Sequence, residues 1–421
     1  MRKKNRSIVV RCFIALSIVG LLVLLCAFID KEANTAIVYK VFKVAQQQYT
    51  QMLKRATDIN KYPRTTDKNG QTKYVGIDDW TGGFWAGNLW YVYEFTKDKK
   101  WEHEAARWTE SLENDQYNTS NHDLGFMMYC SYGNGYRITK NEKYKQILIQ
   151  SAKSLISRYN PNVGCIKSWN SKMSWDGKTL WKYPVIIDNM MNLELLFFAS
   201  KATGDPVYKN IAVKHAETTM KNQVRPDYSC YHVVNYDSAN GHVLNRQTNQ
   251  GFSDNSAWAR GQAWGVYGFT MVYRETHNKK FLNTARKMAD FYINNPHLPK
   301  DKIPFWDFDV DQPGYTPQWN YNKNKFSYIP RDASAAAVIC SALFELSGYL
   351  GREGKKYEHF AIETMKTLAS SNYLATPGKN GNFLLMHSTG SVPHNVEIDV
   401  PLVYADYYFL EALLRYQHQI N

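Results

Sequence analysis

Apolar and amphipathic segments alternate along most of the chain, and a short polar turn joins the two members of each pair. In residues 89–101 an apolar run passes through Thr96-Lys97-Asp98, and an aromatic residue then opens a more polar segment. After each such aromatic residue, small and apolar residues follow at helical spacing. The pattern predicts a repeated αα-hairpin with matching turn chemistry. The same plan recurs over residues 136–144, 197–208, 273–281 and 346–357, with turns at Thr139-Lys140-Asn141, Thr203-Gly204-Asp205, Thr276-His277-Asn278 and Gly351-Arg352-Glu353-Gly354.

Two further segments bring the predicted hairpins to six: a helix over residues 37–56 and a last helix over residues 407–417. Six hairpins in a chain of 421 residues favour a closed ring over an open solenoid. The first helix of each hairpin is the more apolar one, as expected for an inner ring. No Pro-, Gly- or Ser-rich linker divides the sequence. We therefore expect an all-α fold, an (α/α)6 barrel that forms one domain over residues 37–421.

The N-terminus has a different pattern. Five basic residues within the first eleven precede an apolar stretch over residues 12–29, which ends at Asp30. This order is typical of an export signal, and the stretch is also long enough to serve as an uncleaved membrane anchor. We expect residues 1–36 to be a signal peptide or N-terminal membrane anchor, with the protein in the periplasm or anchored facing it. Leu25 precedes Cys26 where a lipoprotein signal would have a small residue, which argues against lipidation.

Charge and composition narrow the possible partners. The formal net charge is +13, and the chain stays clearly basic without its five N-terminal cations. A positive net charge of this size favours binding to an anionic partner, such as nucleic acid, anionic lipid or an acidic polysaccharide. The remaining Lys and Arg residues are scattered rather than interleaved with aromatic residues, so nucleic acid is not an expected partner. Aromatic residues make up 14% of the chain, and their flat faces suit stacking on sugar rings, although they also build cores.

Four cysteines follow the N-terminal stretch, and all lie in apolar or aromatic segments: Cys130, Cys165, Cys230 and Cys340. Export would permit disulfides, but these positions are typical of small core residues. The sequence has no C-x-x-C motif and no Cys/His cluster, so we expect no structural zinc site.

Two aspartates lie where apolar residues would be expected. Asp123 is followed by Leu-Gly-Phe-Met-Met, and Asp188 follows Val-Ile-Ile and precedes Asn-Met-Met-Asn-Leu. Burial of a carboxyl group disfavours its ionised form and raises its pKa, which suits a general acid. Each aspartate could instead cap a helix or pair with a buried Arg, because structural networks also perturb pKa values. Both lie near the start of predicted inner helices, so they should face one end of the central cavity.

Further candidates surround these carboxylates in the sequence. Residues 78–90 place Trp80, Trp85 and a third Trp among glycines just before an inner helix, where rings could be exposed or could fill the core. Arg260 and Trp264 are four residues apart and hence on one helical face. That pair suits a carboxylated sugar, with Arg binding the carboxylate while Trp stacks. The alternative is that Arg260 pairs with a structural Asp.

The chain resembles the unsaturated glucuronyl hydrolases, glycoside hydrolase family 88. The resemblance covers nearly everything after the N-terminal stretch, and it implies an (α/α)6 barrel independently of the hairpin count. It is carried by residues 79–90, His122-Asp123-Leu124-Gly125-Phe126, Ile187-Asp188-Asn189-Met190-Met191-Asn192, Trp258-Ala259-Arg260-Gly261-Gln262-Ala263-Trp264 and Glu397-Ile398-Asp399-Val400-Pro401-Leu402, with 406–413 after it.

The resemblance also implies roles. Asp188 matches the general acid/base, and Asp123 matches the second essential carboxylate, with His122 beside it. Some members of the family carry Ser-x-x-Ser-x-Lys, which is associated with sulfated substrates. This chain keeps both serines and has Pro393 in place of the lysine, which leaves that preference in doubt. Further residues match substrate-binding positions: His232, Gln250, Arg260 and Trp264 in the reacting sugar's subsite, either Trp80 or Trp85 as a stacking ring, and the serines Ser388 and Ser391.

The implied activity removes the terminal 4,5-unsaturated uronic acid from lyase-generated oligosaccharides by hydrating the C4=C5 double bond, and it requires no metal or organic cofactor. The expected partners are therefore acidic unsaturated oligosaccharides, such as glycosaminoglycan lyase products. Two alternatives remain: an unsaturated rhamnogalacturonyl hydrolase, and a non-catalytic binding protein for acidic oligosaccharides. A sugar epimerase on the same barrel would need paired His bases, and the sequence shows no evident pair.

Overall fold

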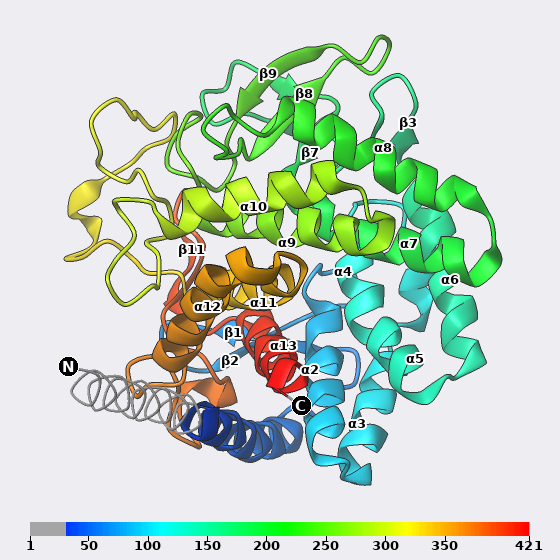
Figure 1. Ribbon diagram of the computed structural model, residues 1–421, viewed down its shortest axis with the longest axis vertical. Helices are drawn as coiled ribbons and strands as arrows, with labels where there is room; N and C mark the ends of the chain where they lie inside the picture. Colours follow the sequence, from blue (N-terminus) through cyan, green and yellow to red (C-terminus); the bar gives the residue numbers. More distant parts are fainter. Residues whose placement is uncertain (1–30, 421) are drawn as a thin grey trace, which may run out of the picture.

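The computed structural model describes residues 31–420 and shows two concentric rings of helices (Figure 1). Contacts between inner helices close the ring from α13 through α2, the α4–α5 segment, α7, α9 and α11 back to α13. The predicted (α/α)6 barrel is confirmed. The inner ring consists of α2 (Gly82–Thr96), α4 (Leu124–Met128) continued by a π-helical turn (Tyr129–Gly133) into α5 (Asn134–Thr139), α7 (Leu193–Thr203), α9 (Ala259–Thr276), α11 (Ala333–Tyr349) and α13 (Val403–Ile420).

The outer ring pairs one helix with each inner one. The first outer helix is described over residues 31–55, so it starts ahead of the predicted residue 37, and it precedes α2 in the chain. The other outer helices each follow an inner helix: α3 (Lys99–Glu110), α6 (Glu142–Ile156), α8 (Pro206–Asn222), α10 (Lys279–Ile293) and α12 (Lys355–Leu368).

Four of the turns that join an inner helix to the next outer helix have the same backbone conformation. The inner helix ends at a residue with positive φ, and the Thr before it accepts a hydrogen bond from the N–H of the residue after it. The Asp or Asn at that last position then caps the outer helix with its side chain. The predicted turn chemistry is therefore confirmed at Thr96-Lys97-Asp98, Thr139-Lys140-Asn141, Thr203-Gly204-Asp205 and Thr276-His277-Asn278. The fifth turn is a 3₁₀ segment (Gly351–Gly354) instead.

Long loops lead from each outer helix to the next inner one, so they gather at the opposite end of the barrel. Small antiparallel sheets form in these loops, in the pairings β1–β2, β3–β4, β5–β6, β7–β8–β9 and β10–β11. Their strands are β1 (Tyr62–Thr66), β2 (Thr72–Val75), β3 (Tyr159–Asn160), β4 (Cys165–Ile166), β5 (Lys172–Met173), β6 (Leu180–Trp181), β7 (Pro184–Ile186), β8 (Val233–Tyr236), β9 (Val243–Gln247), β10 (Ser388–Ser391) and β11 (Val396–Val400). Short 3₁₀ turns also occur there, at Glu113–Tyr117, Ile187–Asn192, Lys323–Lys325 and Asn380–Asn382.

The inner helices are apolar around most of their circumference because both the outer ring and the barrel centre cover them. The four cysteines after the N-terminal stretch are buried, and each has a free thiol, which confirms their prediction as core residues. The predicted leader lies mostly outside the described residues. Within residues 31–420, no helix has the length and apolarity needed to cross a membrane.

Candidate active site

The two aspartates lie on adjacent segments at the long-loop end of the barrel. Asp123 is the residue before α4, and Asp188 lies in the 3₁₀ turn before α7. Asn192 joins the two segments, because its side-chain oxygen accepts a hydrogen bond from the Phe126 N–H at 2.8 Å. A Cβ atom at Gly125 would lie 2.4 Å from the Asn192 Cα, so only glycine permits this close approach. The placement at the start of inner helices is as predicted.

Both carboxyl groups are mostly buried, with 15% of the Asp123 side chain and 14% of the Asp188 side chain exposed. Burial, together with the nearby Asp188 and Asp79 carboxylates, raises the pKa of Asp123 to about 8. Burial also raises the pKa of Asp188 to about 7, although Arg260 and Trp264 act in the opposite direction. Both groups can therefore hold a proton near neutral pH, as a general acid must.

A buried histidine faces each carboxylate. The His232 ring accepts hydrogen bonds at Nδ1 from the backbone N–H groups of Asn249 and Gln250, both at 3.1 Å. Its proton is therefore on Nε2, which lies 3.8 Å from Asp188 Oδ2. Burial holds the pKa of His232 well below its usual range, so the ring is neutral.

His122 has the same relation to Asp123. Its Nδ1 lies 3.5 Å from the Asn192 amide nitrogen, and its Nε2 lies 3.4 Å from Asp123 Oδ1. The Asn192 amide can only donate, so the ring proton is again on the nitrogen that faces the carboxylate. Burial lowers the pKa of His122 to about 3. Each carboxyl group thus has a neutral imidazole N–H near it, and in the described chain neither Nε2 atom has a hydrogen-bond partner.

Aromatic rings form the floor beneath these groups. Trp80 contacts Phe126 and Tyr404 and keeps part of its surface exposed, so it is the ring placed to stack on a sugar. Trp85 is not in the site: it is fully buried between the rings of helices, where it contacts Trp108, so its prediction as a stacking residue is wrong.

Trp264 also differs from the expectation. Its indole is 1% exposed, and the rings of Phe126 and Tyr408 pack against it, so its face is not open to a sugar. Its indole N–H lies near Asp188 and lowers the pKa of that carboxyl group. Trp264 therefore belongs to the site through its polar edge, and the predicted stacking role is wrong.

The guanidinium of Arg260 is bound by other groups of the protein and is buried. It donates to Asp332 Oδ2 at 2.6 Å and to the Gly390 carbonyl at 2.6 Å, with only 2% of the side chain exposed. The ring of Trp258 covers it, 4.7 Å from the guanidinium carbon. The structure therefore shows the alternative named above, in which Arg260 pairs with a structural aspartate. Direct binding of a substrate carboxylate by Arg260 stays a prediction.

The remaining candidates lie on β10 and on the loop before α9. Gln250 donates through its side-chain amide to the Gly390 carbonyl at 3.3 Å, which ties its loop to β10. Ser391 lies at the end of β10, and its hydroxyl is 2.7 Å from His394 Nδ1. Ser388 is fully buried at the start of the strand, and its hydroxyl has no partner within residues 31–420. The structure thus brings both serines to the same side of the barrel as Asp188, while only Ser391 is in a polar cluster.

Comparison with known proteins decides the family. Residues 44–417 match the model of Glycosyl Hydrolase Family 88. The chain belongs to glycoside hydrolase family 88. It is 46% identical, over 90% of its length and 91% of the relative's, to an unsaturated glucuronyl hydrolase of Formosa agariphila. It is 33% identical, over 86% of its length and 92% of the relative's, to one of Bacillus sp. strain GL1.

Solved structures of this family share the fold. An unsaturated glucuronyl hydrolase specific for heparin is 46% identical and superposes with a TM-score of 0.81, covering 93% of this chain and 97% of that one. The enzyme from Streptococcus agalactiae is 31% identical with a TM-score of 0.80, covering 90% of this chain and 92% of that one.

Sequence reasoning missed two residues of this family 88 site. Asp332, which is fully buried, holds Arg260 and caps α11 through the Ser334 N–H. Its position before an Ala-rich apolar run is a helix-start signal that could have identified it. Arg158 lowers the pKa of Asp123, and no local pattern marks it. Within the described chain, no group of three or more His, Cys, Asp or Glu side chains could hold a metal ion.

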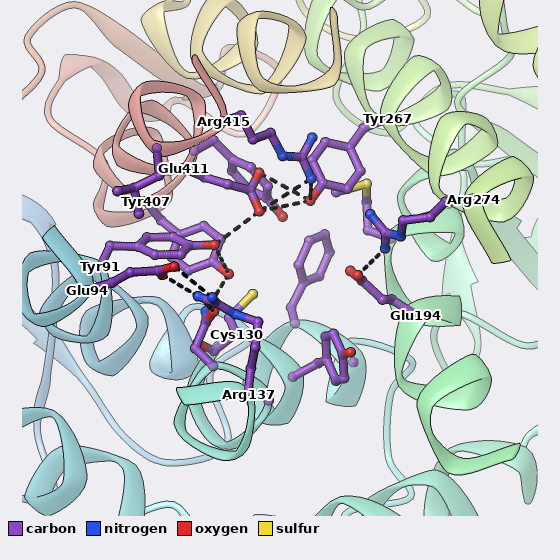
Figure 2. A pocket seen from close by; sticks show the side chains of 18 of the residues that line it. Tyr91, Glu94, Cys130, Arg137, Glu194, Tyr267, Arg274, Tyr407, Glu411 and Arg415 are labelled. Carbon is purple, nitrogen blue, oxygen red and sulfur yellow. Dashed lines mark hydrogen bonds and ion pairs between the residues drawn. The ribbon is translucent and has the colours of Figure 1, made fainter. Parts of the chain in front are cut away.

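A cavity of about 350 Å³ opens at the other end of this family 88 barrel, and neither Asp123 nor Asp188 lines it (Figure 2). Phe126 and Tyr408 line it from the aromatic floor, which thus separates it from the carboxyl groups. Its polar groups bind one another: Glu411 accepts hydrogen bonds from Tyr91 and Tyr267, both at 3.0 Å. The network also includes ion pairs of Arg274 with Glu194 and Glu345, and of Arg415 with Glu345. It ties the inner helices α2, α7, α9, α11 and α13 to one another.

Proposed function

We propose that this chain is a glycoside hydrolase that removes the terminal 4,5-unsaturated uronic acid from oligosaccharides released by polysaccharide lyases. Family membership and 46% identity to an unsaturated glucuronyl hydrolase support this activity. The observation in the structure that supports it most is the placement of Asp188, a carboxyl group that holds its proton near neutral pH beside a neutral histidine.

The chemistry follows from the substrate's double bond. A lyase leaves a C4=C5 bond conjugated with the ring oxygen, and this vinyl ether accepts a proton at C4. Asp188 donates that proton, and water adds at C5 while giving a proton back to the Asp188 carboxylate. The resulting hemiketal opens, and the glycosidic bond breaks without attack at the anomeric carbon. The relation between carboxylate separation and stereochemical outcome therefore does not apply here.

The neighbouring groups support this cycle. The Nε2–H of His232 lies 3.8 Å from Asp188 and has no other partner in the described chain, so it is available to the carboxylate that forms after proton donation. His122 lies beside Asp123 in the same way, and Asn192 holds the segment of Asp123 against that of Asp188; we assign Asp123 the orientation of the attacking water. Because both rings stay neutral, neither competes with Asp188 for the proton. Trp80 offers the exposed ring on which the sugar can stack.

The test is a panel of unsaturated disaccharides made by chondroitin and heparin lyases, followed by the loss of ultraviolet absorbance of the double bond. We expect turnover of unsaturated disaccharides and none of matched saturated glucuronides, because only the vinyl ether accepts the proton at C4. Release of the second sugar from a saturated glucuronide at a comparable rate would show an ordinary glycosidase. Binding of the panel without turnover would favour the non-catalytic alternative.

We also propose that the protein is exported, on the basis of its basic start and the apolar stretch over residues 12–29. Small acidic lyase products would meet it outside the cytoplasm, and the basic balance of the chain would attract them. Cell fractionation with an antibody tests this. Recovery from the soluble cytoplasmic fraction with residues 1–30 intact would exclude export.

A further inference from the structure

An open depression lies on the outer wall of the barrel, between α8 and α10. These helices lie side by side (Figure 1), and the Thr284 hydroxyl on α10 is 3.2 Å from the Met220 sulfur on α8. Tyr231, on the loop that leads from α8 to β8, and Arg246 of β9 complete the lining. The depression has a volume of about 600 Å³, within the range of small-ligand sites, and neither aspartate of the candidate active site lines it.

The lining of this depression is strongly basic. Four cations line it, Lys221, Arg225, Arg246 and Lys280, and the other lining residues are neutral. Lys280 forms an ion pair with Glu217 on α8. The other three cations form no ion pair within residues 31–420. The depression therefore has an excess of positive charge that the protein does not neutralise.

Two of these cations also have free hydrogen-bond donors. The exposed Arg246 donates its Nε–H to the Asn222 carbonyl at 2.8 Å, and its four other N–H bonds have no acceptor in the described part of the chain. The ammonium of the exposed Lys221 likewise has no partner there. A guanidinium with free N–H bonds can bind a carboxylate through two parallel hydrogen bonds.

The third cation is held beside the first. The Arg225 guanidinium donates to the Ser229 hydroxyl and to the Ser256 carbonyl, both at 3.0 Å, so neutral groups fix its position. Its central carbon lies 4.0 Å from the centre of the Tyr231 ring, and that of Arg246 lies 5.5 Å from the same centre. Two guanidinium groups next to one ring repel each other, and an anion bound near them would offset that repulsion.

Two carboxylates lie in the surrounding loops, and both bind groups of the loops themselves. Asp227 accepts hydrogen bonds from the Ser229 N–H at 3.0 Å and from its hydroxyl at 2.7 Å. Asp254 accepts one from the Thr248 N–H at 2.9 Å. Neither carboxylate forms an ion pair with a cation of the described chain. The three uncompensated cations are therefore left for a ligand.

We propose that this depression binds the uronate units of an acidic polysaccharide, outside the catalytic site. Carboxylates spaced along a sugar chain match cations spread over a concave surface, and the free amide nitrogen of Asn283 can bind a sugar hydroxyl. Nucleic acid fits less well, because the rings on which bases would stack already have cations over them, Arg225 on Tyr231 and Lys287 on Tyr228. A flat bilayer would reach only the rim.

Binding at this depression requires neither the C4=C5 double bond nor Asp188, so it goes beyond the proposed function. The probe is fluorescently labelled hyaluronan with saturated ends, a polymer in which uronate and neutral sugar units alternate and no sulfate is present. Its Kd is measured by fluorescence anisotropy. The test variant combines Lys221→Met with Arg246→Met. The matched control combines Lys209→Met with Arg352→Met, which removes the same number of exposed charges elsewhere on the surface.

We expect the Kd for hyaluronan to rise roughly 3- to 30-fold in the test variant, the effect of losing two surface ion pairs, and to change little in the control. The kcat/KM for an unsaturated disaccharide should be the same in both variants, because neither change touches the active site. Equal Kd values in the two variants would overturn the proposal, since they would show a response to net charge alone.

The active site is excluded by filling it. In the Asp188→Asn background, an excess of unsaturated disaccharide should leave the binding of hyaluronan unchanged; loss of binding would place the polymer at the active site and overturn the proposal. Tighter binding of single-stranded DNA or of anionic vesicles, lost in the test variant, would overturn the assignment to a polysaccharide.

The two proposals can fail separately. Hyaluronan binding that depends on Lys221 and Arg246, in a protein that turns over no unsaturated disaccharide, would support this site and refute the proposed function. Normal turnover with the same hyaluronan Kd in the wild type and the test variant would refute this site and leave the proposed function standing.

Discussion

Asp188→Asn is expected to inactivate the protein and to stabilise it at alkaline pH. The amide keeps the shape of the side chain but cannot cycle a proton, and general acid–base catalysis is typically worth about 10²- to 10⁴-fold in rate. The stability effect has a separate cause, because the wild-type carboxyl group becomes costly to bury once it ionises. A single substitution thus reports on both the chemistry and the energetic cost of the site.

The structure sets the size of the stability effect. Burial raises the pKa of Asp188 from its ordinary 3.8 to about 7. Between these values the unfolded chain has lost the proton that the folded protein keeps, so stability falls as pH rises. At 1.36 kcal/mol per pH unit, the full loss is about 4 kcal/mol, and about 3 kcal/mol of it falls between pH 5 and pH 8. Relative to the wild type, Asp188→Asn should therefore gain about 3 kcal/mol over that range.

The measurement is the free energy of unfolding in urea for both proteins at pH 5, 6, 7 and 8, with refolding checked at each pH. Asp98→Asn is the matched control: Asp98 caps α3 on the surface, and Asn fills the same position in the turns before α6 and α10. A difference between Asp188→Asn and wild type that stays constant with pH would refute the inferred pKa of Asp188. Near-wild-type kcat in the same variant would remove Asp188 from the chemistry.

Further predictions concern pH, the aromatic rings, the ion network and salt. The value of kcat/KM should fall about tenfold per pH unit above pH 7, because the protonated Asp188 is the active form; an increase with pH would assign it to a base. Trp80→Ala should raise KM, whereas Trp85→Phe should lower the melting temperature and leave KM unchanged; steady-state kinetics and thermal unfolding separate the two. Glu411→Gln should cost about 2 kcal/mol of unfolding free energy in urea without loss of kcat, since it removes the charged acceptor of the Tyr91 and Tyr267 hydroxyls while Arg415 keeps Glu345. The kcat/KM for an acidic disaccharide should fall as salt rises; a rate independent of ionic strength would exclude steering by the basic charge.

The hairpin architecture was predictable because it rests on local signals. The turn Thr96-Lys97-Asp98 and its three counterparts form hydrogen bonds within the turn itself. A Thr followed two residues later by Asp or Asn therefore gives the same geometry at all four places. The six apolar helices followed from periodicity for the same reason. The small strands were not predicted, because segments such as Val233–Tyr236 pair with residues far away in the chain, at Pro184–Ile186.

The roles of individual side chains were predictable only in part. Asp123 and Asp188 stand out because a carboxylate in an apolar run is conspicuous in any sequence. Trp80 and Trp85 lie five residues apart in the same motif, and only the packing shows that one faces the site and the other the outer ring. Arg260 had an apparent partner in the substrate, but its real partner, Asp332, lies 72 residues away in the sequence. Pairings of this kind depend on the closed barrel and leave no local signal.

The hydrogen bonds of the scaffold fix the tautomers of the two histidines beside the carboxyl groups. The backbone N–H groups of Asn249 and Gln250 occupy Nδ1 of His232, and the Asn192 amide occupies Nδ1 of His122. Each ring therefore carries its proton on the nitrogen nearer the carboxyl group, although neither ring carries a charge. A charged histidine in either place would favour the ionised aspartate and take away the proton that C4 must receive. The burial that keeps both histidines neutral thus also keeps Asp188 protonated, so the same apolar surroundings set the charge state of donor and neighbour together.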